Sequence, residues 1–340
     1  GNDQYSGARF LYRQGLWYGQ HSVRGTGGSY GFGSTNNGMQ YDALEGTIGN
    51  DEVTWEKVRK QNYGIDLKMF DSRFSLTADY FFEHRYDILS SRNTLPSIVA
   101  VNLPLMNLGI VDNKGYEISL GWNDSKRNLN WWIQGNISYS KNKIIYMDEV
   151  SPNYPWMAQT GRSTGLNYGY LFDRFLAVDD FDAEGNLKVD AKGNSLLPAM
   201  SLANPKPGDV LFKDLNGKIN GDDKTYFGYS DRPDYVFGLL GGIRWKGFEI
   251  SMQWTAGLHA SRVLSGEYRE PFGSTNSRAL LKFLANDSWT PNHTNARFPR
   301  MTFTRKQHYL EDSDLWLMDG SYLRLKVLDI GYTFGQSKAL

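Results

Sequence analysis

The stretch from Tyr235 to Trp254, which reads YVFGLLGGIRWKGFEISMQW, constrains the fold more than any other part of the sequence. Every second residue from Tyr235 to Trp245 is apolar or glycine, and the residues between them are Val, Gly, Leu, Gly and Arg. The alternation resumes after Lys246-Gly247 and continues to Trp254. Alternation on both sides of a two-residue connector is typical of a β-hairpin. The sequence therefore predicts a hairpin with one apolar face and one small or polar face.

The same period-two pattern recurs and predicts about eight strands in all. Besides the hairpin, the predicted strands lie at residues 5–16, 55–69, 74–83, 116–122, 133–140 and 322–334. Their second faces carry charged residues such as Asp66 and Glu83, which indicates a sheet with one wet face. In the last strand, Arg324 and Lys326 are predicted to lie on the outward face near the loops, where long stems reach lipid headgroups.

The lengths of the connections alternate. Short turns are predicted at residues 71–72, 123–128 and 246–247, and long intervals at 17–50, 92–113, 148–233 and 259–320. Long segments without clear secondary structure are uncommon inside compact domains and are usually functional. All of them fall at one end of the predicted sheet. Short turns at one end and long loops at the other are the topology of an outer-membrane barrel, with periplasmic turns and extracellular loops.

Bulky aromatic residues flank the short turns. If the apolar face meets lipid rather than a protein core, these residues occupy the position of the aromatic girdle of a membrane barrel. The predicted lipid-girdle residues are Trp122, Trp131, Trp245 and Phe248.

The composition excludes several other classes of protein. The 340 residues contain no apolar run of the about 18 residues that a membrane helix needs. Acidic and basic residues are equal in number, 37 of each, which indicates no nucleic-acid surface. The absence of cysteine removes disulfides and thiolate metal sites. The chain starts with Gly1-Asn2-Asp3, without an initiator Met or a signal peptide, so we expect a processed or truncated chain.

Short motifs occur in a fixed order from Trp55 to the end of the chain. They are Trp55-Glu-Lys57 with Asn62-Tyr-Gly-Ile-Asp66, Asn107-Leu-Gly109 with Asn113-Lys-Gly-Tyr-Glu117, Pro207-Gly-Asp209, Lys213-Asp-Leu-Asn-Gly217, Asp312-Ser-Asp314, Asp319-Gly-Ser-Tyr-Leu-Arg-Leu-Lys326 and Gly331-Tyr-Thr-Phe334. Each motif is weak alone. Together and in this order, they resemble the SusC/RagA-type TonB-dependent transporters, the outer-membrane nutrient importers of Bacteroidota.

This resemblance implies an all-β fold, a large antiparallel transmembrane β-barrel of about 22 strands with a plug inside it. We expect residues 1–340 to form part of that barrel, with about eight of its strands. A plug domain and the final strands are not recognisable in this sequence. The implied function is TonB-dependent import, across the outer membrane, of an oligosaccharide or a peptide. The expected partners are a SusD-like surface lipoprotein, TonB through a segment absent here, and membrane lipid, but not nucleic acid.

Two other functions remain open. A secreted or surface carbohydrate-binding β-sandwich would use aromatic loops as its site and bury the apolar strand faces in a core. A passive porin would share the barrel and need no plug. A membrane barrel exposes Leu76, Phe237 and Ile330 to lipid, whereas a sandwich buries them together.

The long loops contain the candidate substrate-binding residues. Aromatic side chains there would stack on sugar rings or line a peptide-binding cavity, although the same residues could instead pack loop against loop. The candidates are Trp156, Tyr168, Tyr170 and Phe172. We expect no enzymatic activity, because the five histidines are dispersed and the single Gly-x-Ser-x-Gly match, at residues 27–31, falls in the predicted loop 17–50 rather than between a strand and a helix.

The segment from Asp214 to Asp223 is the candidate metal site. Its oxygen-bearing side chains alternate as calcium requires, and the candidate ligands are Asp214, Asn216 and Asp222. Related transporters often carry a longer form with a central Asp-Gly pair, which is missing here. We expect no required cofactor; calcium is the candidate ion, and an Asn/Gly-rich turn is the alternative.

Overall fold

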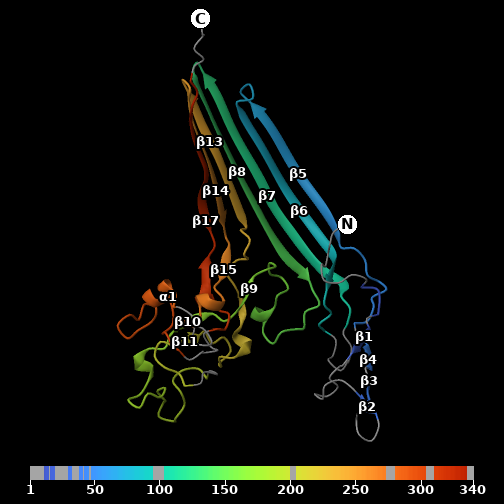
Figure 1. The fold of residues 1–340 in the computed structure, drawn as a ribbon, viewed down its shortest axis with the longest axis vertical. Helices are drawn as coiled ribbons and strands as arrows, with labels where there is room; N and C mark the ends of the chain where they lie inside the picture. The colour runs from blue at the N-terminus through green and yellow to red at the C-terminus, as the bar shows by residue number, and fades with distance from the viewer. Residues whose placement is uncertain are drawn as a thin grey trace. The chain divides into compact units, whose positions relative to one another are not determined.

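The computed structural model describes residues 11–14, 16–19, 30–32, 38–40, 42–45, 47–94, 103–199, 204–272, 280–303 and 310–334. Its main element is an antiparallel sheet of seven long strands in the order β17-β14-β13-β8-β7-β6-β5 (Figure 1). These strands are β5 (Lys57–Met69), β6 (Phe74–Ser90), β7 (Met106–Lys126), β8 (Leu129–Tyr146), β13 (Tyr235–Trp245), β14 (Phe248–Leu258) and β17 (Tyr322–Tyr332). The spatial order follows the chain, so the sheet is an up-and-down meander.

Tight turns join the long strands in pairs, as predicted. β13 and β14 pair without interruption from Tyr235 and Leu258 to the residues beside the connector. In that connector, Lys246 and Gly247 have φ angles of 46° and 88°. Positive φ at both central residues defines the type I′ turn, whose twist matches that of the strands. The turn predicted at 123–128 is shorter than expected, because β7 continues to Lys126.

Three strands extend further toward the loops than the sequence predicts. β6 reaches Ser90, β8 reaches Tyr146, and β7 begins at Met106, inside the predicted loop 92–113. The prediction was wrong at these ends because polar residues occupy both faces there. Asp112, Asn113 and Lys114 follow one another in β7, so the alternation that marks a half-buried strand disappears before the strand does.

The chain forms two compact units. The first comprises Gly1–Gln61, Phe82–Lys114 and Asn142–Ser151, and the second comprises Asn62–Phe81, Gly115–Lys141 and Pro152–Leu340. The boundary crosses β5, β6, β7 and β8, so each of these strands contributes residues to both units. No helix in the described ranges is long and apolar enough to cross a membrane.

In the first unit, the segment before the long sheet contains two short ladders. β1 (Leu16–Gly19) pairs with β4 (Asp42–Glu45), and β2 (Tyr30–Phe32) pairs with β3 (Gly38–Gln40). The prediction of a loop over 17–50 was therefore wrong in part, because strands of three or four residues are too short to show an alternating pattern. Most of the strand predicted at 5–16 lies outside the described residues, and residues 11–13 form a turn and bend.

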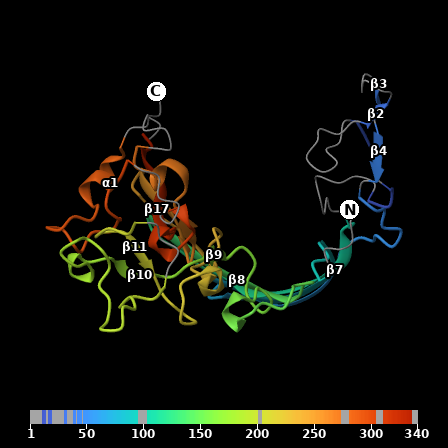
Figure 2. The same ribbon diagram turned by 90° about the horizontal axis from the view of Figure 1, so that it is seen from below.

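In the second unit, the predicted long loops contain short elements. β9 (Asn167–Gly169) pairs with β12 (Thr225–Phe227), β10 (Phe172–Phe175) with β11 (Val210–Phe212), and β15 (Ser261–Val263) with β16 (Leu317–Asp319). The helix α1 (Lys282–Asn286) lies beside β10 and β11 (Figure 2). The 3-10 turns are η1 (Pro155–Met157), η2 (Val178–Asp180), η3 (Gly221–Asp223), η4 (Gly266–Tyr268) and η5 (Asp314–Trp316).

These short elements enclose a buried hydrophobic core. Its members come from distant parts of the second unit and include Leu176, Val210, Phe212, Leu284, Phe298, Leu315 and Trp316. Leu315 and Trp316 are each only 1 % exposed. The long loops of this unit therefore fold into a packed body of their own, which the sequence did not predict.

A bulge in β17 changes which of its residues face outward. The pairing with β14 shifts after Gln253, so that Trp254 pairs with Leu325 and Thr255 with Arg324, while Lys326 is the extra residue. Directly paired residues share a face of the sheet, and a one-residue shift exchanges the two faces. Arg324 therefore lies opposite to the face of Trp254. The prediction that Arg324 and Lys326 are both outward was wrong for this reason.

Candidate functional site

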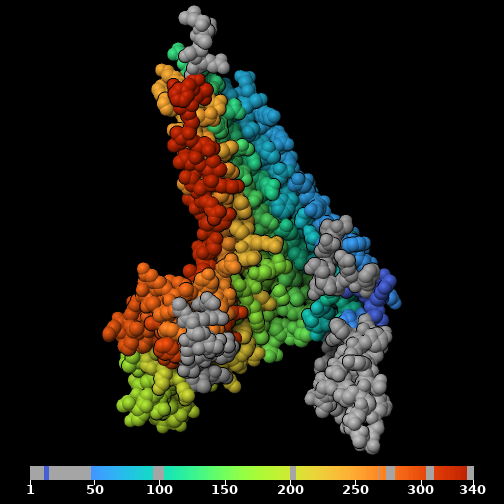
Figure 3. Space-filling view, in the orientation of Figure 1, coloured from blue at the N-terminus to red at the C-terminus, as the bar shows by residue number. Residues whose placement is uncertain are grey.

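One face of the long sheet is apolar, and no second layer among the described residues covers it. We call the face that carries Leu76, Phe237 and Ile330 the apolar face. Ile330 is 71 % exposed and Leu239 is 45 % exposed, and β17 and β14 lie open along the surface in Figure 3. Among the buried hydrophobic residues of the described ranges, Ile144 alone belongs to this sheet. Leu76, Phe237 and Ile330 therefore do not share a buried interior.

The opposite face carries polar residues that pair across neighbouring strands. The Thr77 hydroxyl donates a hydrogen bond to Asp66 over 2.7 Å. The Arg244 guanidinium lies 2.8 Å from the Glu249 carboxylate. Exposed pairs of this kind contribute little to stability. Their position on one face shows that this face suits water, whereas the apolar face suits a hydrocarbon environment.

The four predicted girdle residues all lie at the turn end of the sheet. The rings of Trp122 and Trp131 stack with centroids 6.5 Å apart, and Trp245 and Phe248 are 51 % and 54 % exposed. Phe74 joins this row 6.1 Å from Trp122. Large aromatic rings are thus concentrated on the apolar face beside the tight turns.

A second aromatic row crosses the sheet nearer the loops, and the sequence did not predict it. It lies on the apolar face and consists of Tyr63, Tyr80, Tyr116, Tyr139 and Tyr235. Tyr139 pairs directly with Tyr235, with ring centroids 4.6 Å apart, and Tyr116 lies 5.5 Å from Tyr139. Each of these strands carries a tyrosine on this face, but it lies six residues from the turn end in β5 and β6 and ten residues from it in β7, β8 and β13. The row becomes visible only when the strand register is known.

On β13 the two aromatic rows are separated by about the thickness of a bilayer core, whereas on β7 Tyr116 and Trp122 are six residues apart. Trp245 and Tyr235 are the two ends of β13. Ten steps at about 3.3 Å give about 33 Å along the strand, and a tilt of about 40° reduces this to about 25 Å along the membrane normal. The apolar band of a transmembrane barrel has this height.

Between the two rows the apolar face has a hollow. Gly135 provides no side chain, and the surrounding residues leave a volume of about 550 Å³. Its walls are almost entirely apolar and include Ile118, Leu120, Ile137, Phe237, Leu239 and Trp254. The face is therefore uneven as well as apolar.

The loops of the second unit present an aromatic surface, which we call the tyrosine ledge and define by Trp156, Arg162, Tyr168 and Tyr226. Tyr168 on β9 pairs directly with Tyr226 on β12, and their rings lie 4.8 Å apart. The Arg162 guanidinium lies over the Tyr226 ring at 5.1 Å. Backbone carbonyls of Ala158 and Trp156 accept hydrogen bonds from Arg162 at 2.8 and 3.0 Å. The cation is thus held in place against the aromatic pair.

Trp156 is fixed at the edge of the ledge. Its indole N–H donates to the carbonyl of Asp222 over 2.8 Å, and its ring stacks on Tyr154 with centroids 4.5 Å apart. Tyr168 is the most open member, at 36 % exposed. Burial raises the pKa of Tyr168, so its hydroxyl is protonated at neutral pH and donates as well as accepts hydrogen bonds.

The other two predicted aromatics pack inward. Tyr170 stacks on Phe212 with centroids 4.5 Å apart and nearly parallel planes, and it packs against the buried core. Phe172 also packs against this core and lies 4.9 Å from Phe175. The structure therefore separates the four predicted binding residues into Trp156 and Tyr168 on the ledge, and Tyr170 and Phe172 against the core.

Sequence reasoning missed Tyr226 and Arg162, the other two members of the ledge. Tyr226 lies 58 positions after Tyr168 in the sequence. No local pattern relates the two, and only the pairing of β9 with β12 brings them together.

Lys224 adds a second cation close to the ledge. Its ammonium group lies 4.9 Å from the Tyr170 ring centroid and 2.9 Å from the Glu311 carboxylate. Burial alone lowers the pKa of Lys224, but the hydrogen bond and charge of Glu311 outweigh it, and the net pKa is raised. Lys224 is therefore a cation at neutral pH, although Glu311 already balances its charge.

The candidate metal loop is held by hydrogen bonds of its own. The Asp214 carboxylate accepts the backbone N–H groups of Asn216 and Gly217 at 3.0 and 2.6 Å, and the Asp222 carboxylate accepts from Asn153 at 3.0 Å. The two Asp214 contacts are those of an Asx-type turn, whereas Asn153 lies outside the loop. The described ranges contain no group of three or more His, Cys, Asp or Glu residues placed to hold an ion. The calcium hypothesis therefore remains a prediction.

Comparison with known proteins gives one consistent result. The sequence profile of the family described as "TonB dependent receptor-like, beta-barrel" matches residues 1–299. "TonB-dependent receptor P3" of Formosa agariphila is 28 % identical over 304 residues, which cover 85 % of this chain and 28 % of that protein. "TonB-dependent receptor SusC" of Bacteroides thetaiotaomicron is 23 % identical, over 90 % of this chain and 28 % of that protein.

Solved structures show the same fold. The RagAB peptide importer in the "open-open" state matches with a TM-score of 0.65 and 17 % identity, over 96 % of this chain and 32 % of that one. The "closed-closed" state matches with a TM-score of 0.62. The chain spans about a third of the length of the proteins it matches.

Proposed function

Because this chain belongs to the TonB-dependent receptor-like β-barrel family, we propose that it forms part of the wall of an outer-membrane importer of the SusC/RagA type. The importer takes up a nutrient at the cell surface, and TonB energises its passage through the barrel. The chain contributes a lipid-facing wall, a polar lining and part of the extracellular loops. It acts in permeation and recognition, and it catalyses no reaction.

The single observation that carries this proposal is the asymmetry of the long sheet. An exposed apolar face with an aromatic row at each end lies on one side, and paired polar residues lie on the other. A carbohydrate-binding sandwich would cover the apolar face with a second layer of protein, and Leu239 at 45 % exposure is not covered. Lipid is the environment that suits such a face.

The two edge strands of the sheet indicate that it belongs to a larger barrel. β5 and β17 are the two edge strands, and an unpaired backbone group inside a bilayer costs several kcal/mol, roughly the cost of burying a polar group without a partner. We therefore propose that residues 1–340 are one part of the barrel domain of a longer transporter, whose other strands pair with β5 and β17.

The chemistry of the tyrosine ledge suits a solute with flat, partly apolar faces. Tyr168 and Tyr226 offer two rings and two hydroxyls, which suit the C–H faces and hydroxyls of a sugar ring. We therefore favour an oligosaccharide. Arg162 supports a second candidate, a peptide, because a guanidinium fixed at 5.1 Å from the Tyr226 ring pairs well with a carboxylate. A SusD-like surface lipoprotein is the proposed partner that delivers the solute to the loops.

The proposal is tested with the full-length transporter gene in its native host. A deletion strain is compared with the wild type for growth on single oligosaccharides and on peptide mixtures, with and without functional TonB. We expect one class of nutrient to require both the transporter and TonB. Growth that requires the transporter but not TonB would indicate a passive porin. A transporter protein found in the soluble fraction would contradict a membrane barrel.

A further inference from the structure

The outward side of the sheet becomes basic at the loop end of the first unit. In β5, alternation from Tyr63 places Arg59 and Lys57 on the apolar face. In β7 and β8, the same alternation from Tyr116 and Tyr139 places Lys114 and Lys143 on that face. We call Lys57, Arg59, Lys114 and Lys143 the basic band. All four are exposed.

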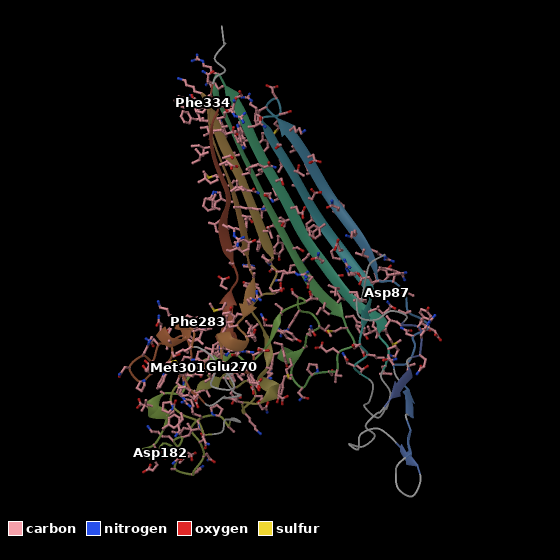
Figure 4. All side chains as sticks on the ribbon, in the orientation of Figure 1. Asp87, Asp182, Glu270, Phe283, Met301 and Phe334 are labelled. Atoms are coloured by element: carbon pink, nitrogen blue, oxygen red, sulfur yellow. The ribbon has the colours of Figure 1, made fainter. Side chains whose placement is uncertain are left out.

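One aromatic ring and two carboxylates lie beside the cations of this band. Lys57 and Arg59 lie over the Tyr86 ring at 5.8 and 5.6 Å, and His84 stacks beside Tyr86 with centroids 5.7 Å apart. Lys57 pairs with Asp87, labelled at the loop end of β6 in Figure 4, over 2.8 Å. His84 contacts Asp112 over 2.7 Å. The charged groups of Lys57 and Arg59 therefore both lie near the Tyr86 ring.

Three of the four cations form no ion pair within the described ranges. These are Arg59, Lys114 and Lys143. The opposite face at the same height differs, because Lys60 pairs with Glu83 over 2.7 Å and Arg85 pairs with Glu56. These two lumen-side cations are thus paired within the chain. On the outward side the four cations of the band face two carboxylates, Asp87 and Asp112, so a net positive charge remains there.

The height of the band matches the headgroup layer of the outer leaflet. Arg59, Lys114 and Lys143 lie 10, 12 and 14 residues from the turn end of their own strand. At about 3.3 Å per residue and a tilt of about 40°, this is about 25 to 35 Å from that end along the membrane normal. The apolar band of a barrel is about 25 Å tall. The cations therefore lie where phosphate groups of lipids lie.

We propose that the basic band binds the phosphorylated headgroup of an outer-leaflet lipid, with Arg59, Lys114 and Lys143 spread over three strands to contact its phosphate groups and Tyr86 supporting Arg59. This inference rests on the proposed membrane function. The solute is a less suitable ligand for this site, because the band faces away from the lumen. Each surface cation near an anionic membrane strengthens binding by about fivefold, so three together give a strong preference for phosphorylated lipid.

The test uses the full-length transporter in mild detergent, with lipid A bisphosphate and the same lipid after dephosphorylation as probes. Retained lipid is measured by native mass spectrometry. We expect the wild type to retain the phosphorylated form preferentially, and the triple variant R59Q/K114Q/K143Q to lose at least about fivefold for each cation removed. The charge-preserving variant R59K/K114R/K143R is expected to retain the lipid.

Lys60→Gln is the matched control. It removes one positive charge beside Arg59 on the opposite face, and we expect lipid retention to be unchanged. Equal retention by the triple variant, or no preference for phosphate in the wild type, would overturn the proposal. So would competition by millimolar inorganic phosphate that abolishes lipid binding, because the site would then take the free anion. Heat-modifiable mobility of each variant reports barrel assembly separately, so a failure of the proposed membrane function is distinguished from a failure of this inference.

Discussion

The long sheet and the loops of the second unit use hydrophobic residues in opposite ways. In the sheet, Ile330 and Leu323 are each 71 % exposed, whereas in the loops Leu315 and Trp316 are each 1 % exposed. The residue types are the same in the two regions. The difference indicates two solvents, since loops in water must bury their apolar surface to fold, and a face in hydrocarbon has no reason to do so.

Charged residues are also placed differently in the loops and in the sheet. In the loop core, Asp209 is fully buried and its carboxylate accepts hydrogen bonds from Arg300 and from the Lys206 N–H. In the sheet, charged residues between the two aromatic rows stay on the face opposite to the apolar one, as with Arg244 and Glu249. A region folded in water can bury a charge if it is paired. A strand segment in lipid instead keeps its charges on the lumen side.

The largest expected effect is the loss of the loop core. Leu315→Ala removes a side chain that is 1 % exposed and packed within the core. Such substitutions cost about 2–5 kcal/mol, so the loops should become sensitive to external protease while the barrel still assembles. Leu323→Ala, on the apolar face of β17, should leave loop cleavage unchanged. Equal cleavage of both variants would remove the distinction between the two regions.

A charge placed on the apolar face should have the next largest effect. Leu239→Arg introduces a cation near the middle of the lipid-facing band, which costs about 2–4 kcal/mol and should reduce the heat-modifiable, assembled form in outer membranes. Leu240→Arg is the matched control. Its side chain lies on the opposite face, in register with Gln253 and Gln134. If both variants assembled equally well, the apolar face would not meet lipid.

The accuracy of the strand prediction also differs between segments with a lipid-facing side and segments with water on both sides. The strands were predictable wherever one face meets hydrocarbon, because strict alternation then marks them, as in residues 235–254. The prediction failed at Asp112 to Lys114, where both faces are wet, and at Lys126, where the turn is shorter than its polar sequence suggests. It also failed at Arg324, because a bulge leaves no trace in composition.

The candidate site was less predictable than the strands. Aromatic content alone selected Trp156, Tyr168, Tyr170 and Phe172, but it cannot separate a ring that faces solvent from one that packs on a core. That separation depends on which residues lie across β9 and β12, and Tyr226 and Arg162 entered the site only through this pairing. Long-range pairing of three-residue strands has no local signal in one sequence.

The tyrosine ledge gives a smaller effect, on capture rather than on stability. Tyr168→Ala removes a ring 4.8 Å from Tyr226, and the loss of an aromatic contact of about 0.5–1.5 kcal/mol should weaken solute capture by about two- to tenfold. The control is Tyr268→Ala, an exposed loop tyrosine outside the ledge. Binding is measured with radiolabelled solute on intact cells. Unchanged capture by Tyr168→Ala would exclude the ledge from the solute pathway.

The smallest expected effect is a pH response confined to the loops. Arg174 forms a two-point contact with Asp180 at 2.6 and 3.0 Å, and Asp180 also accepts the Ala177 N–H. Burial alone raises the pKa of Asp180, but these hydrogen bonds outweigh it and hold the pKa below its ordinary value of 3.8.

A lowered pKa in the folded state means that the stabilisation is fully present above pH 3.8 and is lost as the pH falls through the folded-state pKa. Pepsin cleavage of residues 178–190 should therefore increase in that acidic range. Asp180→Asn should remove this step, because its side chain no longer titrates, while the heat-modifiable form of the sheet stays constant in both proteins. If the wild type and Asp180→Asn lost loop protection along the same pH curve, another carboxylate would control the acid response of the loops.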